Sequence, residues 1–266
     1  MLPDRLFAGY VFDLDGTIYL GDALLPGARH TIETLRSGDA RIRFLSNNPL
    51  QTRSDYAAKL TRLGVSTSPD QVINSSWVLA RWLKQEAPGA SLFVIGEQPL
   101  VDVLQRAGFR LTDRPQEIAF VVASFDRTLD YAKLQIAFDA IRAGARFVAT
   151  NADRYCPVPG GGLPDAAAVI GAIEGCTGIP VETVVGKPSP ITAAAILEQL
   201  DLPAAECVMV GDRLETDIRM GQQAGMATAV VLTGVTTPQV LAASDIEPDY
   251  VLKRVDELLP DPQTEA

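Results

Sequence analysis

The chain has 266 residues, of which 47% are hydrophobic, so it can bury a sizeable core in one large domain or two modest ones. Its formal net charge of −10 argues against nucleic acid or an anionic membrane surface as a partner, because both are bound by clustered Lys and Arg. The longest apolar stretches have the length of strands, not the roughly 20 residues that cross a bilayer, and the N-terminus lacks the pattern of a signal peptide, so we expect a cytoplasmic protein.

Short aliphatic runs alternate with helical patterns along most of the chain, which predicts βαβ units, a parallel sheet and the α/β class. The first run, residues 9–14, is apolar except for Asp13. Burying a carboxylate at the end of such a strand costs free energy, so we expect Asp13 to have a specific role there. The predicted elements that follow it are helix 27–37, strand 42–46, helix 53–63, helix 73–84 and strand 92–95.

The middle of the chain repeats this alternation until a stretch rich in Gly and Pro, residues 157–164, interrupts it. We interpret this stretch as a loop that lies beside another part of the molecule. Before it the pattern predicts helix 100–107, strand 118–124, helix 131–143 and strand 147–150, and after it an alanine-rich helix to about residue 176. The last third predicts strand 184–185, helix 190–200, strand 207–210, helix 215–224 and strands 228–232 and 250–252.

Two acidic residues, Asp13 and Asp15, follow the first predicted strand in the sequence Asp-Leu-Asp-Gly-Thr. Residues two apart on an extended segment point the same way, so both carboxylates can face one pocket past the strand, where open α/β sheets bind ligands. Two carboxylates in one pocket repel, which calls for a cation such as Mg²⁺ or for a protonated general acid. Gly16 lets the backbone approach a bound anion. The alternative is an exposed turn without chemistry.

Further polar groups follow three later strands. Ser46 and Asn47 can donate hydrogen bonds to phosphate oxygens, although Ser-Asn-Asn is also a common turn. Lys187 stands just before a helix start, where the helix dipole disfavours a cation unless the cation serves a bound anion. Asp212 would complete a Mg²⁺ site, whereas Asp217, in the first turn of the next helix, either supports that site or only caps the helix.

In this order, each at a strand end, the motifs resemble those of the haloacid dehalogenase superfamily: DxD, a Ser or Thr after a strand, a Lys, and GD…D. Residues 15–21 and 25–28 are similar to the subgroup of p-nitrophenyl phosphatases and the nag-operon phosphatase. The resemblance implies a Rossmann-like parallel-sheet core, residues 1–76 and 184–266, with an inserted α/β cap of the C2 type at residues 77–183 that sets substrate specificity.

Within that subgroup, sugar phosphatases of bacterial arabinose operons are the most similar, on four segments: 94–98, 149–154, 171–174 and 232–234. The resemblance implies a phosphatase that acts on a small phosphorylated metabolite, with a sugar phosphate as the expected substrate. Nucleotides, glycerol phosphate and pyridoxal phosphate remain alternative substrates. A phosphomutase, a true dehalogenase and a non-enzymatic phosphoacceptor module are weaker alternatives, and a homodimer is left open.

The resemblance also implies a mechanism in two steps. Asp13 would attack phosphorus to form an aspartyl-phosphate, and Asp15 would protonate the leaving alcohol and then deprotonate the hydrolytic water. Mg²⁺ would be held by the Asp13 carboxylate, the Asp15 backbone carbonyl and Asp212. Gly16, Ser46, Asn47 and Lys187 would hold the transferring oxygens, and Asp217 would support the metal ligands from behind.

No core side chain is left to bind the organic part of the substrate, so we expect the cap to read it. Asn151 and Asp153 follow a predicted cap strand, and Asp165 begins the cap's last helix, which faces the substrate in the family.

The three cysteines lie far apart and in odd number, which suits neither a disulfide framework nor a CxxC metal site. The sequence leaves the roles of Cys156 and Trp77 open.

Overall fold

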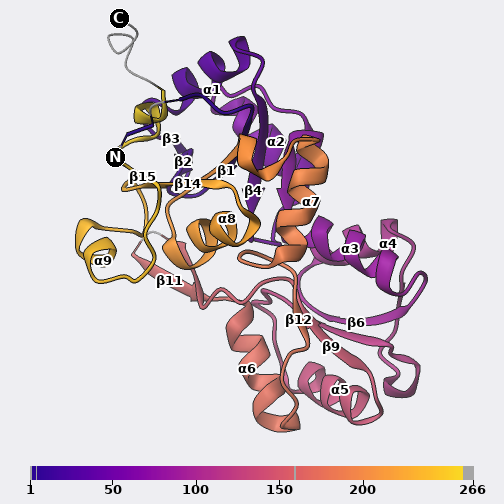
Figure 1. Ribbon diagram of the computed structural model, residues 1–266. Helices are drawn as coiled ribbons and strands as arrows, with labels where there is room; N and C mark the ends of the chain where they lie inside the picture. Colours follow the sequence, from indigo (N-terminus) through magenta and orange to yellow (C-terminus); the bar gives the residue numbers. More distant parts are fainter. Residues whose placement is uncertain (1, 4, 159, 260–266) are drawn as a thin grey trace, which may run out of the picture. The chain divides into compact units, whose positions relative to one another are not determined.

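The computed structural model describes residues 2–3, 5–158 and 160–259. The chain folds into two compact units, of which the first comprises residues 1–46, 54–73 and 192–266 and the second comprises residues 47–53 and 74–191. Figure 1 labels many of the elements of both units. No helix of the described residues is long and apolar enough to cross a membrane.

The first unit is built on a six-stranded sheet whose central strand is β1 (Gly9–Asp13). β1 pairs in parallel with β4 (Arg41–Ser46) on one side and with β13 (Cys207–Gly211) on the other. The carboxyl ends of β1, β4 and β13 therefore meet at one edge of the sheet, and the chain order reverses between β1 and β13, as at the ligand sites of open α/β sheets. The full order is β15 (Tyr250–Leu252), β14 (Ala227–Val231), β13, β1, β4 and β5 (Val72–Asn74).

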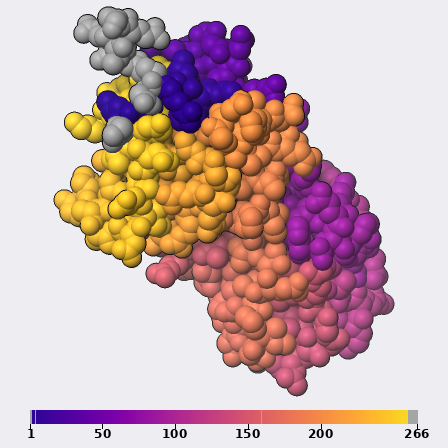
Figure 2. Space-filling view, viewed as in Figure 1, coloured from indigo at the N-terminus to yellow at the C-terminus, as the bar shows by residue number. Residues whose placement is uncertain are grey.

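Alternate residues of these strands bury opposite faces of the sheet, as the two-residue period of a strand requires. Tyr10 and Phe12 face one side, where they pack in a hydrophobic core with residues of α1 (Ala28–Ser37) and α2 (Arg53–Arg62). Val230 faces the other side and packs against the helical segment 214–218. The remaining helices are α7 (Pro190–Leu200), α8 (Arg219–Ala224) and α9 (Pro238–Ala242), with short 3-10 turns at Pro69–Gln71, Ala204–Glu206 and Val255–Leu258. Figure 2 shows the C-terminal part of the chain, in gold and yellow, over much of the visible face of this unit.

The second unit has its own five-stranded parallel sheet, covered by helices on both faces (Figure 1). Val121 and Phe147 belong to a core with residues of α5 (Tyr131–Arg142) and α6 (Ala166–Thr177). Phe120 on the opposite face meets Trp82 of α3 (Ser75–Glu86) edge to face, with ring centroids 6.3 Å apart. The strand order is β12 (Thr183–Val184), β9 (Arg146–Ala149), β8 (Phe120–Ala123), β6 (Ser91–Ile95) and β7 (Arg110–Leu111). The helices are α3 (Ser75–Glu86), α4 (Gln98–Arg106), α5 (Tyr131–Arg142) and α6 (Ala166–Thr177).

The predicted α/β class with parallel sheets is confirmed, and three local predictions were wrong. The helix expected from residue 73 begins at Ser75, because the side chain of Asn74 caps it by accepting the N–H of Trp77 at 3.0 Å, while residues 72–74 form β5. The Gly- and Pro-rich stretch expected as a loop forms an antiparallel hairpin, β10 (Tyr155–Val158) and β11 (Gly161–Pro164). Proline is tolerated there because a two-stranded hairpin has only edge strands.

The helix expected over residues 215–224 is also divided. It begins as a π-helical turn, Leu214–Ile218, and continues as α8. Within the described residues, the strands β2 (Tyr19–Leu20), β3 (Ala23–Leu24) and β7 and the short helix α9 were also not predicted, because each is too short to show a period.

Candidate active site

The loop after β1 folds back on itself and leaves the two acids of the first motif in different environments. The backbone N–H of Tyr19 donates to the carbonyl of Leu14 at 3.2 Å. Gly16 adopts φ = +85°, which a residue with a side chain adopts only under strain. In this loop Asp13 is buried at the carboxyl end of β1, while Asp15 is exposed.

Tyr19 contacts Asp15 from within the core. Its hydroxyl donates to Oδ2 of Asp15 at 3.3 Å, and the ammonium of Lys59 lies 3.8 Å from the centroid of its ring. Burial raises the pKa of the Tyr19 phenol far above its ordinary value, and the nearby Asp15, Tyr56 and Asp13 act in the same direction. The phenol therefore stays protonated and orients the Asp15 carboxylate as a hydrogen-bond donor.

Three buried carboxylates gather at the edge where β1 and β13 end. Asp13, Asp212 and Asp217 each offer an oxygen, and these atoms all lie within 4.8 Å of one another. Desolvated like charges at this distance repel strongly unless a cation or a proton compensates them. An all-oxygen, all-carboxylate donor set suits a hard divalent cation such as Mg²⁺. The residues therefore fit a magnesium ion, with Asp217 in the group itself although the sequence placed it behind the ligands.

Backbone groups enclose Asp212 and fix its orientation. Its Oδ2 accepts the N–H of Val235 at 2.6 Å, and its backbone carbonyl accepts the N–H of Thr236 at 3.1 Å. A β carbon at Gly234 would lie 2.0 Å from the same oxygen, and one at Gly16 would lie 2.6 Å from it. The hydroxyl of Thr233 donates to the carbonyl of Gly16 at 2.6 Å, so the segment 233–236 closes over the first motif.

Asp217 is held in place by the turn that precedes α8. Its Oδ2 accepts the N–H of Arg213 at 3.0 Å, and its side chain lies against Gly211, where a β carbon would approach it to 2.3 Å. Asp217 is fully buried, which distinguishes it from an ordinary exposed cap residue. This arrangement brings the acid beside the end of β13 rather than into solvent.

Ser46 ends β4 at the same edge of the sheet as Asp13. It is buried, and its hydroxyl donates to the hydroxyl of Tyr56 on α2 at 3.2 Å. The parallel register of β1 and β4 sets Asp13 opposite Leu45, one residue before Ser46. The structure thus brings this hydroxyl to the strand end beside the nucleophile candidate.

Asn47 and Lys187 belong to the second unit and are joined directly. The N–H of Lys187 donates to Oδ1 of Asn47 at 2.8 Å, and Nδ2 of Asn47 donates to the carbonyl of Lys187 at 3.2 Å. The same Nδ2 donates to both carboxylate oxygens of Asp153, at 3.3 and 3.2 Å. Lys187 is buried and Asp153 is partly buried. Asp153, one of the three expected substrate-reading residues, therefore contacts a residue of the second motif directly.

The other two expected substrate-reading residues, Asn151 and Asp165, are buried and bonded to each other. Nδ2 of Asn151 donates to Oδ1 of Asp165 at 3.2 Å, and the same oxygen accepts the N–H of Ala166 at 2.6 Å, which caps α6. The hydroxyl of Thr150 donates to Oδ1 of Asn151 at 2.8 Å and lies 2.8 Å from that of Ser124. This network joins the ends of β8 and β9 to the start of α6.

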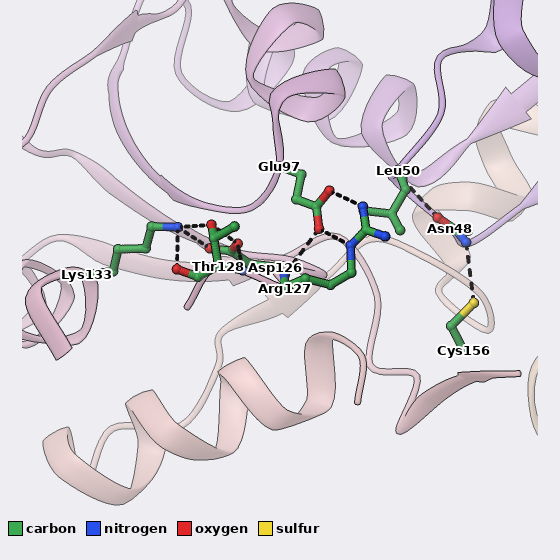
Figure 3. Close-up of polar contacts among 8 residues, drawn as sticks. All are labelled: Asn48, Leu50, Glu97, Asp126, Arg127, Thr128, Lys133 and Cys156. Atoms are coloured by element: carbon green, nitrogen blue, oxygen red, sulfur yellow. Dashed lines mark hydrogen bonds and ion pairs between the residues drawn. The ribbon is translucent and has the colours of Figure 1, made fainter. Parts of the chain in front are cut away.

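A second polar pair lies at the carboxyl ends of β6 and β8. The guanidinium of Arg127 binds Glu97 through Nε at 2.6 Å and through Nη2 at 2.7 Å, and these hydrogen bonds lower the pKa of Glu97. Figure 3 shows this pair together with Asn48, whose Nδ2 lies 3.6 Å from Sγ of Cys156. Asn48 also accepts the N–H of Leu50 at 2.9 Å, which shapes the turn after the second motif.

Sequence reasoning missed Tyr19 and the segment 233–236 as parts of this site. Thr233 and Gly234 follow strand β14, and in the sequence they stood out only as part of a segment similar to sugar phosphatases. The feature that could have identified them is their position after a fourth parallel strand, because parallel strands bring their carboxyl ends to one edge of the sheet. Trp77, whose role was left open, stacks beneath the guanidinium of Arg53, which lies 4.9 Å from its ring centroid.

Comparison with known proteins agrees with this geometry. A model of the family described as haloacid dehalogenase-like hydrolase matches residues 10–110, and a second model of hydrolases of this kind matches residues 184–258. The chain belongs to the haloacid dehalogenase-like hydrolases, and it is a phosphatase.

The relatives place the chain more narrowly. It is 41% identical to the sugar-phosphatase AraL of Bacillus subtilis over 248 residues, which cover 93% of this chain and 90% of that one. It is 33% identical to the acid sugar phosphatase of Staphylococcus saprophyticus, covering 95% of this chain and 97% of that one. Among solved structures, the 4-nitrophenylphosphatase of Thermotoga maritima superposes with a TM-score of 0.91 at 36% identity, covering 95% and 96% of the two chains. NagD of E. coli K-12 superposes at 0.87 with 30% identity, covering 95% and 98%. The predicted family and subgroup are confirmed.

Proposed function

We propose that this phosphatase hydrolyses sugar phosphates in a Mg²⁺-dependent reaction with Asp13 as the nucleophile. The observation that carries the proposal is the group of three buried carboxylates, Asp13, Asp212 and Asp217, at the carboxyl edge of the first sheet. The substrate class comes from two relatives that are similar to this chain over nearly its whole length, since both are named as sugar phosphatases.

Asp13 attacks phosphorus, the bond from phosphorus to the ester oxygen breaks, and an aspartyl-phosphate forms. Asp15 donates its proton to the departing alcohol oxygen, and it then removes a proton from the water that attacks the same phosphorus and releases orthophosphate. The exposure of Asp15 supports this role, since a proton carrier must reach both alcohol and water. The hydrogen bond from Tyr19 holds the carboxylate toward that task.

Asp13 and Asp212, with Asp217 beside them and the backbone carbonyl of Asp15, would hold the magnesium ion. A bound Mg²⁺ supplies the positive charge that lets a carboxylate and a phosphate ester approach each other. In a chain with a net charge of −10 this compensation matters more than in a neutral protein.

The transferring phosphate oxygens are held by groups at the strand ends. The Ser46 hydroxyl, the backbone at Gly16 and Asn47, and the Lys187 ammonium can donate hydrogen bonds to an anion. We assign the chemistry to the core, residues 1–76 and 184–266. We assign recognition of the leaving group to the inserted cap, residues 77–183.

The test is an Mg²⁺-dependent phosphate-release assay on a panel of sugar phosphates, glycerol phosphate, nucleotides and pyridoxal phosphate, with Asp13→Asn as the variant. Asp13→Asn keeps the shape of the side chain but is a poor nucleophile, so it should lower kcat by more than about a hundredfold with little loss of folding. A preference for nucleotides or pyridoxal phosphate would replace the substrate assignment. An isomerised sugar phosphate without free phosphate would identify a mutase instead.

A further inference from the structure

The side-chain amide of Asn47 is occupied on all sides within the protein. Oδ1 accepts the N–H of Lys187, and the two hydrogens of Nδ2 are directed to the Lys187 carbonyl and to the Asp153 carboxylate. Its backbone carbonyl accepts the hydroxyl of Ser75 at 2.6 Å. Asn47 is only 7% exposed, so these contacts are shielded from water.

The paired hydrogen bonds to Lys187 fix the backbone on both sides of its α carbon. An amide that binds the N–H and the carbonyl of one residue determines both adjoining peptide planes, and so the direction in which the side chain leaves the backbone. The backbone at the neighbouring Gly186 is closely packed. A β carbon there would lie 2.6 Å from the carbonyl oxygen of Thr150 and 2.8 Å from Oδ1 of Asn47.

Asp153 determines which way round the Asn47 amide sits. With its carboxylate 3.2 Å from Nδ2, a flipped amide would set Oδ1 against a negative charge and would remove the donor from the Lys187 carbonyl. The loop after β9 therefore selects the one orientation of Asn47 that pairs with both backbone groups of Lys187.

We propose that Asn47 is a positioning residue that sets the Lys187 ammonium for the phosphoryl group, and that Asp153 keeps Asn47 in its orientation. The inference rests on the proposed function, in which Lys187 contacts the phosphate. It assigns the Asn47 side chain to Lys187 and leaves only the backbone of Asn47 to meet an anion. Because the phosphoryl group is common to all substrates, disturbing Asn47 or Asp153 impairs every phosphate ester alike.

The experiment is a double-mutant cycle on the full chain, with Asn47→Ala, Lys187→Met and the double variant. The measurements are kcat and KM for a sugar phosphate and for p-nitrophenyl phosphate, and the inhibition constant of orthophosphate. We expect Asn47→Ala to lower kcat/KM on both substrates by about ten- to a hundredfold, the scale of a roughly 1 Å misplacement, and to weaken orthophosphate inhibition. When Lys187 is already replaced by Met, adding Asn47→Ala should lower kcat/KM by less than about threefold further, because the ammonium group that Asn47 positions is no longer present.

A conservative pair separates positioning from simple loss of folding. Asn47→Asp keeps the acceptor for the Lys187 N–H, loses the donor to the Lys187 carbonyl and sets a carboxylate against Asp153. Adding Asp153→Asn removes that repulsion and restores the hydrogen bond between residues 47 and 153, but not the one to the Lys187 carbonyl. The swapped pair should regain up to about tenfold of the kcat/KM lost by Asn47→Asp. Gln51→Glu is the matched control, since it adds the same charge to an exposed side chain of the same segment and should stay within about twofold of wild type.

The possible results distinguish a failure of this inference from a failure of the proposed function. Full additivity of Asn47→Ala and Lys187→Met overturns the inference and leaves Lys187 as a phosphate ligand. No recovery in the swapped pair, when its melting temperature matches wild type, overturns the part of the inference that assigns the orientation of Asn47 to Asp153. Unchanged kinetics and phosphate inhibition in Lys187→Met alone overturn both the inference and the role of Lys187 in the proposed function.

Discussion

A single methyl group at Gly234 should disturb the magnesium site through Asp212. A β carbon there would lie 2.0 Å from Oδ2 of Asp212, 2.6 Å from its Cγ and 2.7 Å from its Cβ. Non-bonded contacts of this kind are most stable near about 3.5 Å. Gly234→Ala therefore requires a displacement of about 1 Å or more between the segment 233–236 and the carboxylate.

Asp212 is restrained when the methyl group is added. Gly16 lies close to the same oxygen, where a β carbon would approach it to 2.6 Å, and the 2.6 Å hydrogen bond from Val235 ties the carboxylate to the segment that would be pushed. Metal ligands must keep their distances within about 0.2 Å, and losing a group that orients a ligand costs about ten- to a hundredfold in metal affinity or activity. We expect the Mg²⁺ concentration for half-maximal activity to rise by that factor, with a smaller fall in kcat at saturating metal.

The assay is a Mg²⁺ titration of phosphate release, accompanied by the Mg²⁺-induced rise in melting temperature, which does not depend on turnover. Gly171→Ala is the control, since a β carbon at that position in α6 would meet no heavy atom within 4 Å apart from its chain neighbours and the backbone of its own helix. An unchanged half-activation concentration and an unchanged melting shift in Gly234→Ala would refute the argument that Asp212 belongs to the metal site.

Three other substitutions test separate parts of the structure. Asp15→Asn should lower kcat strongly for sugar phosphates but least for p-nitrophenyl phosphate, whose leaving group needs no proton; equal losses on both substrates would exclude a general acid. Burial raises the pKa of Asp126, but hydrogen bonds from Lys133 and neighbouring groups outweigh it, so the net pKa is lowered. The stabilisation is therefore present above about pH 4 and is lost as the pH falls through the folded-state pKa. Asp126→Asn should lower the unfolding free energy at pH 7, by an amount that shrinks in acid titrations. Arg146→Met should lower the free energy of unfolding by about 1 kcal/mol, because the ion pairs of Arg146 with Glu86 and Glu182 are partly exposed. Thermal unfolding should show this loss of stability, and kcat should not change.

The regular parts of the fold were predictable because burial imposes simple periods on the sequence. β1 is five buried residues flanked by turns, and its ends were predicted to within one residue. The hairpin 155–164 was not predictable in this way, since its side chains are largely exposed and its composition resembles a turn. The start of α3 depended on one capping side chain, Asn74, which overrode the helical period of the residues before it.

The candidate site was predictable where a motif stands at the end of a strand, because parallel pairing brings such ends together. Asp13, Ser46 and Asp212 follow this rule. The burial of Asp217 and its place among the carboxylates were not predictable, because they depend on a π-helical turn that no local pattern announces. The enclosure of Asp212 by residues 233–236 is likewise a contact between segments that are distant in the sequence.

Asp153 shows how the same residue leads to different expectations from sequence and from structure. As a strand-end acid in the cap it was expected to bind a sugar hydroxyl, and its removal would then lower kcat/KM for a sugar phosphate by about tenfold or more while sparing p-nitrophenyl phosphate. In the structure its carboxylate accepts from Asn47, which binds both backbone groups of Lys187. Because Asn47 positions Lys187 for every substrate, Asp153→Ala, which removes the acceptor, is expected to lower kcat/KM on both substrates by similar factors and to weaken orthophosphate inhibition. Measuring the ratio of kcat/KM on the two substrates decides the point: a ratio that moves by about tenfold supports substrate reading, and a constant ratio with weakened phosphate binding supports the contact with Asn47.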